Sequence, residues 1–370
     1  MSPCRVAVLA ASIQKETNTL EDYLQSQGLP QPDFSLDSPL KLPLPQSIAI
    51  SVQTALEAAD ELHSLLLGPL GFILHQVDAT HNIIGLHAVS RFEISKRFPV
   101  GQEISFSEVA AKCGVDADDM CRILRHAVTN HIFTEPREGF IAHTAVSKAL
   151  AEVPMLHEWV TMACEDMWPP TTRLVDAMNK WPGSGEPRQT AYNLASRAEG
   201  SFFEELERSS ERSERFSKAM SLFKIMPGFE PSLVADSKLW KGVSGTVVDV
   251  GGANGALACE LAKKYPAVQI IVQDLPSVIE NTQQFPVYPH TDKVTFQAHD
   301  FFSEQPIRGA DVYIFRMIFH DWSEKFCKRI LQQLIPALKI GARILINDFC
   351  IPERGATSMY QERVARQVNF

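Results

Sequence analysis

The segment from residue 246 to residue 274 constrains the fold of this chain more strongly than any other. It opens with the β-branched run 246–250, which predicts a strand buried on both faces. Gly251 and Gly252 follow at once, and a helix-period stretch then leads to a second apolar run that ends at Asp274. This order predicts a strand–helix–strand unit with glycines at its first turn, where open α/β sheets bind ligands.

The glycine pattern differs from that of a dinucleotide-binding turn. Counted from Gly251, the pattern G-x-G-x-x-G needs glycines where this chain has Ala253 and Ala256. Asp249 stands two residues before the glycine pair, where a carboxylate repels a diphosphate and attracts a positively charged ligand. Asp274, at the end of the second strand, suits a ribose diol. This pattern resembles the S-adenosylmethionine motif of class I methyltransferases, and a generic nucleotide-binding turn is the alternative.

Composition and charge narrow the class of protein. A chain of 370 residues predicts two domains, and its 45% apolar and 21% charged content is typical of a globular protein. The net charge of −9 disfavours nucleic acid and anionic membranes as partners. The seven cysteines include no C-x-x-C pair, so we expect no metal site, and reduced thiols in a cytoplasmic setting. No apolar run reaches the ~20 residues of a membrane span.

The beginning of the chain predicts an extended arm that is followed by helices. Residues 28–46 contain five prolines and are expected to be neither helix nor sheet. Residues 47–72 and 82–92 have helical periodicity, and the glycines and proline of 68–71 are expected to end the first of these helices.

Residues 104–150 have the element order of a winged helix. Helices are predicted over 106–112 and 116–129, and strands over 133–135 and 140–142, joined by a charged turn. A winged helix can bind DNA, but three acids at the start of the second helix would repel phosphates. A DNA-binding regulator is therefore the less favoured alternative, and we expect a protein-contact or dimerisation module.

Residues 155–229 carry apolar and aromatic side chains in a polar helical background. Phe216 and Met220 are four residues apart and therefore share a helix face. Ordinary core packing explains such spacing equally well, so the residues alone leave their role open. The side chains that stand out are Met162, Met167, Trp168, Phe216, Met220 and Phe223.

Helices and strands alternate over the rest of the chain. Helices are predicted over 275–284 and 324–338, and further strands over 294–297, 312–315 and 343–346. This alternation predicts a parallel, doubly wound sheet. Polar side chains gather at the carboxyl ends of its strands, namely Asp249, Asp274, Asp300, Arg316, His320 and Asp348.

His320 is the candidate catalytic base. Imidazole has an ordinary pKa near 6.5, so a neutral ring can accept a proton from a phenol or an enol. Two carboxylates flank it, Asp321 in the sequence and Asp348 at the end of the next strand. They are expected to orient the ring and to stabilise the imidazolium. A surface or helix-capping histidine is the alternative.

From roughly Glu21 onward, the chain resembles fungal O-methyltransferases of the plant caffeate O-methyltransferase-like family. The matching features are the proline-rich arm, the winged-helix region and the motifs VVDVGGANG, VQDLP, HDFF and FRMIFHDWS. The resemblance implies an α/β fold, in which a mainly helical winged-helix dimerisation domain precedes a Rossmann-like doubly wound parallel sheet. It also implies S-adenosyl-L-methionine as the cofactor and a homodimer.

The resemblance further implies roles for individual residues. His320 matches the general base of the family and Asp348 one of its two supporting acids. The pocket for the methyl acceptor is expected to involve Met162, Met167, Trp168, Phe216 and Met220. The cofactor-binding set is Asp249, Gly251 and Gly252 beside methionine and ribose, Asp274 at the ribose hydroxyls with Leu275 next to it, Asp300 and Phe301 beside adenine, and Arg316 where the family often has lysine.

Three segments are predicted as domains. Residues 1–150 are expected to dimerise, residues 151–235 to connect and to contribute to the acceptor pocket, and residues 236–370 to bind the cofactor. The family continues with the rest of a helix, a second supporting acid and a closing pair of strands, whereas this chain stops at Phe370. The sequence thus predicts a shortened C-terminus with an uncovered sheet edge, which invites non-native pairing.

The predicted activity is methylation of a phenolic or enolic hydroxyl on an aromatic or polyketide-type secondary metabolite. His320 is expected to remove the proton while the oxygen attacks the sulfonium methyl, with most of the rate coming from the geometry of approach. One alternative is a methyltransferase-like protein that binds the cofactor without methyl transfer, such as a pericyclase, a cyclase or an inactive partner subunit. An NAD-dependent dehydrogenase is a more distant alternative. The expected partners are a small-molecule acceptor and a second copy of the chain, without nucleic acid or membrane.

Overall fold

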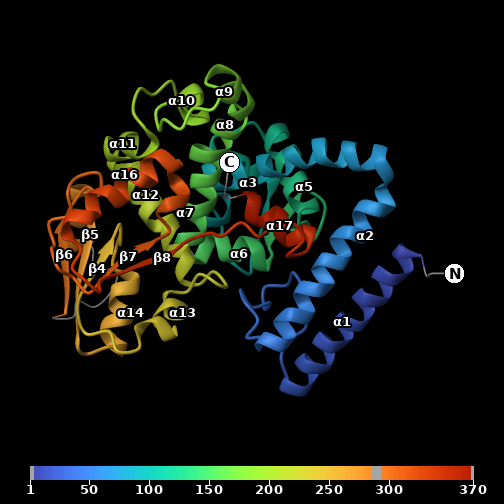
Figure 1. The fold of residues 1–370 in the computed structure, drawn as a ribbon. Helices are drawn as coiled ribbons and strands as arrows, with labels where there is room; N and C mark the ends of the chain where they lie inside the picture. Colours follow the sequence, from blue (N-terminus) through green and yellow to red (C-terminus); the bar gives the residue numbers. More distant parts are fainter. Residues whose placement is uncertain (1–3, 285–292, 368–370) are drawn as a thin grey trace. The chain divides into compact units, whose positions relative to one another are not determined.

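The computed structural model describes residues 4–284 and 293–367 (Figure 1). The chain forms two compact units, the first from residues up to 166 together with 352–364, the second from residues 167–351 and 365 onward. The division into three segments stays a prediction. None of the helices that the structure describes has the length and hydropathy that a membrane crossing requires.

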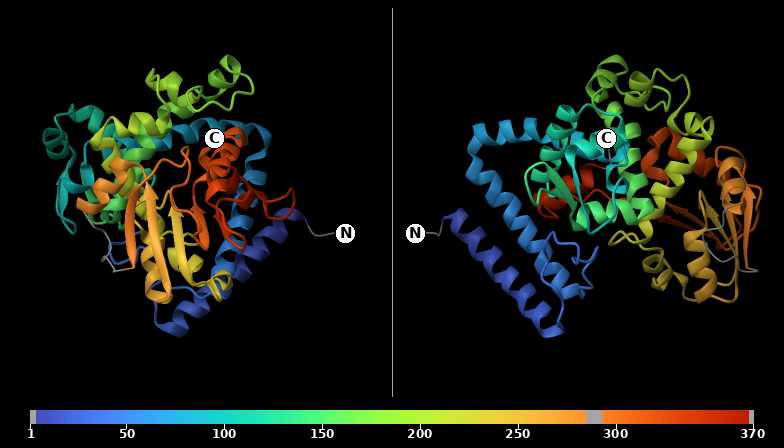
Figure 2. Two further views of the ribbon diagram at one scale, coloured as in Figure 1. Left: turned by 60° about the vertical axis from the view of Figure 1, so that its left-hand side comes forward. Right: turned by 180° about the vertical axis from the view of Figure 1, so that it is seen from behind.

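The first unit begins with two long helices that lie side by side (Figures 1 and 2). They are α1 (Arg5–Gln27) and α2 (Gln46–Asp78), and the proline-rich segment between them is non-helical, as predicted. The predicted break at 68–71 is confirmed, because two helical segments meet there at a kink. Gly68 has φ 62° and ψ 178°, so the helix bends there and resumes at Pro69, which suits a first helical position because it needs no N–H partner.

The winged-helix elements follow in the predicted order. Asp116 accepts hydrogen bonds from the backbone N–H groups of Asp118 and Asp119, so part of the acidic cluster serves as a helix cap. The antiparallel sheet has the order β1-β3-β2, and its first strand was not predicted because it spans only three residues. The elements are α3 (Asn82–Arg91), β1 (Glu103–Ser105), α4 (Phe106–Cys113), α5 (Ala117–Thr129), β2 (Phe133–Thr134) and β3 (Phe140–His143).

Short helices fill the middle of the chain. In the first unit these are α6 (Ala145–Glu152) and α7 (Pro154–Met162), and this unit also holds most of α17 (Met359–Arg366). In the second unit they are α8 (Trp168–Thr171), α9 (Leu174–Lys180), α10 (Ala191–Ser196), α11 (Phe202–Glu207), α12 (Ser210–Met220) and α13 (Pro231–Ala235).

The second unit contains the predicted parallel sheet (Figure 2). Its strands are β4 (Gly245–Val250), β5 (Val268–Asp274), β6 (Val294–Ala298), β7 (Val312–Arg316) and β8 (Arg343–Asn347), in the order β6-β5-β4-β7-β8. The chain builds outward from β4 in both directions. The strand order therefore reverses between β4 and β7, which is where doubly wound sheets bind ligands.

Apolar side chains on both faces of this sheet bury it between helices. Val247 and Ile270 pack on one face against α14 (Ala256–Lys264), and Val248 and Phe315 pack on the other face against α16 (Glu324–Leu334). The helix α15 (Pro276–Gln284) connects β5 to the segment before β6. This two-sided burial explains why β4 and β7 have continuous apolar runs and not alternating ones.

The strand β8 lies at one edge of the described sheet. Its Ile346 side chain is 56% exposed, although the central strands are almost fully buried. Ile340, in the turn before β8, is fully exposed. Apolar side chains are thus accessible along this edge of the described sheet.

Candidate active site

The turn after β4 passes directly over a buried carboxylate. A Cβ atom at Gly252 would lie 2.7 Å from the carboxyl carbon of Asp249 and 2.9 Å from a methyl group of Val272. Gly251 has φ 71°, a conformation that L side chains rarely adopt. Both glycines are therefore required by geometry, the first by its backbone angle and the second by the space that Asp249 fills.

The amide groups of this turn are used inside the protein. The N–H groups of Gly251 and Gly252 both donate to the backbone carbonyl of Gln273, at 2.8 and 3.1 Å. The N–H of Ala253 donates to Oδ2 of Asp274 at 2.8 Å. A phosphate-binding turn directs such donors at its ligand. This turn instead holds Asp274 and the end of β5 in a fixed position.

Two acidic side chains near this turn have raised pKa values. Burial raises the pKa of Asp249 to about 7, with Arg316 lowering it and Asp274 raising it further. Burial also raises the pKa of Asp274 to about 6, against hydrogen bonds from the N–H groups of Leu275 and Ala253 that lower it. Ionised carboxylates are costly in this buried environment. A ligand that carries positive charge or offers hydroxyl donors would therefore stabilise them.

The other predicted cofactor residues lie on the same edge of the sheet. Asp300 follows β6, and its Oδ1 accepts a hydrogen bond from the N–H of Phe302 at 2.9 Å. The Phe301 ring lies beside Gly251, 3.8 Å from where a Cβ of that glycine would be. Arg316 ends β7, and its Nη2 donates to the carbonyl of Phe229 at 2.5 Å. The structure thus gathers this whole predicted set at one edge.

His320 is held by Asp348. Its Nδ1 lies 2.6 Å from Oδ1 of Asp348, a residue that directly follows β8. Oδ2 of Asp348 accepts from the backbone N–H groups of Ile318, Phe319 and His320 at 3.2, 2.7 and 3.3 Å. One carboxylate therefore fixes both the imidazole and the backbone that carries it. With Nδ1–H donating to Asp348, Nε2 is the ring atom that can accept a proton.

Asp321 lies on the other side of the ring. Its Oδ1 is 3.4 Å from Nε2 of His320. Burial raises the pKa of Asp321 to about 6, with His320 lowering it and Asp348 raising it. The predicted histidine and both of its acids are therefore together in the structure.

Two groups of aromatic rings include residues next to this histidine in the sequence or in space. In the first group, Phe203 stacks on Trp322 with ring centroids 5.8 Å apart, and Phe216 contacts Phe203 edge-on at 6.2 Å. In the second group, Phe349 contacts the His320 ring edge-on at 5.3 Å and the Phe229 ring at 5.4 Å. Phe216 thus lies in the same aromatic group as Trp322.

The remaining predicted acceptor residues are more scattered. Met220 ends α12 and is half-buried, Met167 is exposed and Trp168 begins α8. Met162 is buried and belongs to the first unit. A role for these four side chains in the pocket stays a prediction.

Several residues of the site were not predicted from the sequence. Phe349 directly follows Asp348, so its position beside His320 could have been inferred. Gln273 and Gln305 gave no signal, because a neutral amide in an apolar strand or a loop suggests no chemistry. Their side chains are buried and bonded to each other.

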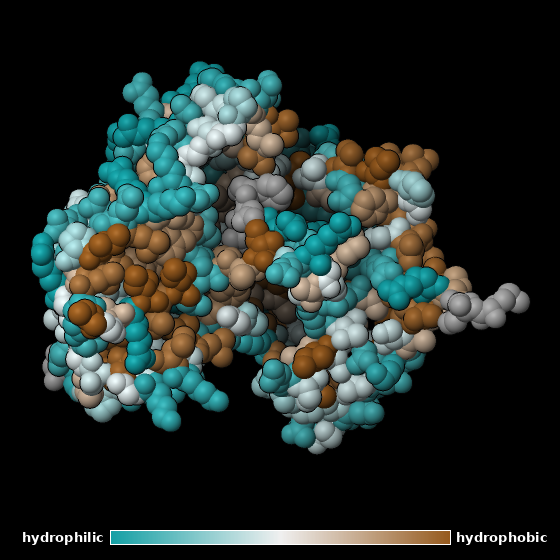
Figure 3. All heavy atoms as spheres, viewed as in Figure 1, coloured by the Kyte–Doolittle hydropathy of each residue, from teal (hydrophilic) through white to brown (hydrophobic). Residues whose placement is uncertain are grey.

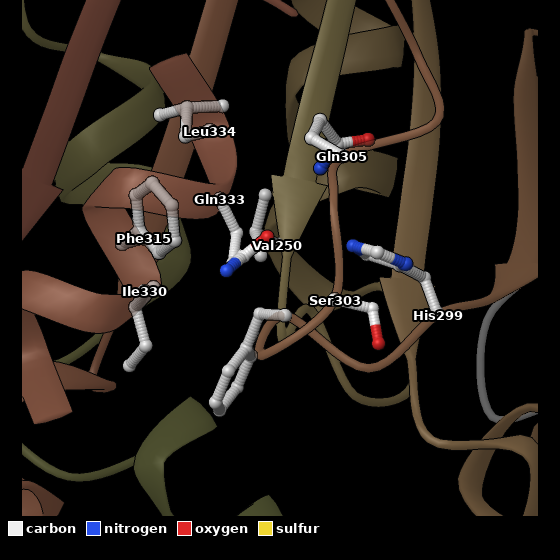
Figure 4. A pocket seen from close by; sticks show the side chains of 9 residues that line it. Val250, His299, Ser303, Gln305, Phe315, Ile330, Gln333 and Leu334 are labelled. Atoms are coloured by element: carbon white, nitrogen blue, oxygen red, sulfur yellow. The ribbon is translucent and has the colours of Figure 1, made fainter. Parts of the chain in front are cut away.

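A small cavity is lined by residues of β4, the loop that follows β6, β7 and α16 (Figure 4). Its volume is about 10 Å³, which is room for about one water molecule and not for a cofactor. His299, Ser303, Gln305 and Gln333 supply its polar lining.

Comparison with known sequences identifies a matching family and close relatives. The model of the O-methyltransferase domain matches residues 181–369. Chlorophenol O-methyltransferase from Trichoderma longibrachiatum is 37% identical, over 99% of this chain and 80% of that protein. The grayanic acid biosynthesis cluster O-methyltransferase from Cladonia grayi is also 37% identical, over 99% of this chain and 77% of that protein.

Solved structures share the fold. OxaC has a TM-score of 0.75 at 22% identity and covers 99% of this chain and 90% of its own. LepI in complex with SAM has a TM-score of 0.70 at 22% identity, with 97% and 89% covered. Human N-acetylserotonin methyltransferase in complex with SAM has a TM-score of 0.64 at 23% identity, with 80% and 85% covered.

Proposed function

Because the chain belongs to the O-methyltransferase family and uses S-adenosylmethionine, we propose that it methylates a phenolic or enolic hydroxyl group with His320 as the general base. The observation that carries this proposal is the bond of 2.6 Å between Nδ1 of His320 and Asp348. It leaves Nε2 as a proton acceptor on a ring whose position is fixed from two sides.

The proposed reaction needs one proton transfer and one methyl transfer. Nε2 of His320 takes the proton of the acceptor hydroxyl, and the oxygen forms a bond to the methyl carbon. The cofactor, when bound, supplies that methyl group on a sulfonium and leaves as the neutral thioether. Asp348 stabilises the imidazolium that forms, and Asp321 lies close enough to share its charge.

The proposed cofactor contacts follow from charge and position. Asp249 lies beneath the glycine turn and attracts the sulfonium, and Asp274 accepts the ribose hydroxyls. Asp300 and Phe301 border the adenine, and Arg316 holds the segment at Phe229. Leu275 supports the set through its N–H, which donates to Asp274.

The proposed acceptor is a flat aromatic or polyketide-type metabolite. Phe349 and Phe229 form one aromatic surface next to the base, and Trp322 and Phe203 form another. Aromatic surfaces favour ring-shaped ligands through stacked and edge-on contacts. The names of the relatives, a chlorophenol enzyme and a grayanic acid cluster enzyme, support the same class.

A homodimer is also proposed, on the basis of the first unit. The second part of α2 exposes four apolar side chains at helical spacing, and Figure 3 shows hydrophobic atoms gathered over this helix. They are Leu70, Ile73, Leu74 and Val77, each more than half exposed. Such a stripe in a long helix favours a protein partner.

The role of His320 can be tested with a radiolabelled methyl group on the cofactor. The variant His320→Ala is expected to transfer label to a phenolic acceptor about 10²- to 10⁴-fold more slowly than wild type, which is the usual contribution of a general base. Its affinity for the cofactor should stay within about twofold of wild type, because His320 holds no cofactor atom in the proposal.

The control for this experiment is His81→Ala. His81 is exposed and ends the short turn of residues 79–81 between α2 and α3. It should transfer label at the wild-type rate. Full label transfer by His320→Ala would refute the base assignment. If wild type binds the cofactor and converts a substrate without moving label, the chain acts by a reaction other than methyl transfer.

A further inference from the structure

A reciprocal pair of amides is buried beside the cofactor edge of the sheet. Nε2 of Gln273 donates to Oε1 of Gln305 at 2.9 Å, and Nε2 of Gln305 donates back to Oε1 of Gln273 at 2.8 Å. Gln273 also donates to Gln297 at 2.8 Å. The exposed fractions of Gln273 and Gln305 are 0% and 3%, so water does not compete for these bonds.

Gln273 joins three segments that contribute cofactor residues. Its backbone carbonyl accepts both N–H groups of the glycine pair, and the next residue is Asp274. Its side chain reaches the loop after β6 through Gln305, which Figure 4 shows on the same loop as His299 and Ser303. This loop carries Asp300 and Phe301.

Gln305 is also held by residues other than Gln273. Its backbone N–H donates to the carbonyl of Gln333 in α16 at 3.0 Å, and its Oε1 accepts from the N–H of Ile307 at 3.0 Å. The amide pair therefore connects the end of β5 to a loop that is anchored to a helix. A displacement of this loop requires that buried amide bonds break, and an unpaired buried amide is costly.

We propose that the Gln273–Gln305 amide pair sets the distance between the ribose-binding carboxylate and the adenine-binding loop. Both glutamines are then positioning residues for S-adenosylmethionine, since they touch the residues that bind it and not the cofactor itself. The inference rests on the proposed cofactor site and adds to it a buried element that neither charge nor motif had indicated. Its expected signature is a loss of cofactor affinity without a loss of turnover.

The test uses calorimetric titration with S-adenosylmethionine, steady-state kinetics and thermal unfolding of Gln273→Leu, Gln305→Leu and the double variant. Each single variant is expected to bind the cofactor about tenfold more weakly and to raise its KM by the same factor, with kcat within about twofold of wild type. The double variant leaves fewer buried amides unpaired, so its loss of unfolding temperature should be smaller than the sum of the two single losses. Its affinity should stay about tenfold reduced, because the spacing is still not set.

Tyr313→Phe is the matched control. Tyr313 is fully buried in β7, and its hydroxyl donates to the carbonyl of Ile307 at 2.6 Å without contacting the glycine turn or Asp274. This variant should lose unfolding temperature and keep wild-type affinity. An affinity loss in Tyr313→Phe equal to that of Gln273→Leu, or a double variant that regains wild-type affinity, would show that the glutamines matter only for stability.

Asp274→Asn separates a failure of the inference from a failure of the site. If Asp274→Asn loses affinity while both glutamine variants bind as wild type does, the inference is wrong and the cofactor site stands. If Asp274→Asn binds the cofactor as wild type does, the proposed ribose contact is wrong, and the inference falls with it.

Discussion

At the scale of single residues, the site contains charges that the fold does not favour. Asp249 is almost fully buried, and its pKa is raised from 3.8 to about 7. A buried carboxylate that is costly in the free protein can be stabilised by a cationic ligand, which then binds more tightly. Replacement of this acid by a neutral residue is therefore expected to raise the stability of the free protein and to lower its affinity for the cofactor.

The variant Asp249→Asn is expected to become more stable relative to wild type as the pH rises. A raised pKa means that the folded protein holds the proton more tightly, so the stability that Asp249 contributes is complete below about pH 4 and is lost as the pH rises through about 7. From pH 4 to pH 8, the unfolding free energy of the variant minus that of wild type should increase by about 4 kcal/mol at most. Thermal unfolding of the ligand-free proteins at both pH values measures this shift.

The same variant should bind S-adenosylmethionine more weakly at pH 8, by about tenfold or more, because it lacks the negative charge. Asp22→Asn, in the exposed face of α1, is the control for the loss of one acid and should change neither quantity. An unchanged affinity in Asp249→Asn would contradict the assignment of this carboxylate to the sulfonium.

At the scale of secondary-structure elements, the strand-to-helix turn after β4 is the tightest part of the site. The variant Gly252→Ala introduces a Cβ 2.7 Å from the Asp249 carboxyl group, so the carboxylate or the turn must move. We expect cofactor affinity to fall by about tenfold or more, because displacements of about 1 Å at a reacting site have large effects. Calorimetric titration measures the affinity.

The matched control for that substitution is Gly71→Ala. Gly71 lies in the second part of α2, and its nearest atoms are at an ordinary distance of 3.4 Å. This variant should keep wild-type affinity and gain up to about 1 kcal/mol of stability, because alanine favours a helix. Wild-type affinity in Gly252→Ala would show that the turn is not in contact with the cofactor.

The strands of the second unit were predictable, the central ones because they are buried on both faces. All five strands of the described sheet were predicted within about two residues of their ends, a precision typical of strongly patterned segments. The first unit was less predictable. The helix α1 buries only Leu9 and Leu24, so its periodicity is weak and it was not predicted. The second part of α2, which starts at Pro69 after the kink at Gly68, was not predicted either.

The charged part of the site was predictable and its neutral part was not. Asp249, Asp274 and His320 gave signals because each of them suggests a chemical role at a strand end. Gln273 shares a strand with Asp274, but nothing in the sequence indicates that its amide meets Gln305, 32 residues later. Contacts of this kind depend on how two loops pack, which is tertiary information.

At the scale of the whole molecule, the first unit presents an apolar surface to solvent. The stripe of Leu70, Ile73, Leu74 and Val77 would stabilise an assembly by roughly 1.5–3 kcal/mol for each side chain that becomes fully buried. In the proposed homodimer, these four side chains would lie against the second copy of the chain.

The double variant Leu70→Asp with Ile73→Asp is expected to convert a dimer into a monomer, because two buried charges without partners oppose assembly. Size-exclusion chromatography with light scattering measures the mass. The matched control is Val175→Asp with Met178→Asp in α9, which replaces two equally exposed apolar residues of the second unit. The control should remain a dimer. A dimeric first variant would mean that the stripe is not the contact.

The internal use of the amide groups at Gly251, Gly252 and Ala253 has a consequence for the cell. ATP and NAD share adenine and ribose with S-adenosylmethionine, but their phosphates need free N–H donors. The N–H groups of this turn are already bonded within the protein, and the Asp249 carboxylate repels phosphates. Abundant adenine nucleotides should therefore compete poorly for the site. The rate of methylation would then follow the ratio of methyl donor to its spent thioether and stay independent of the energy charge of the cell.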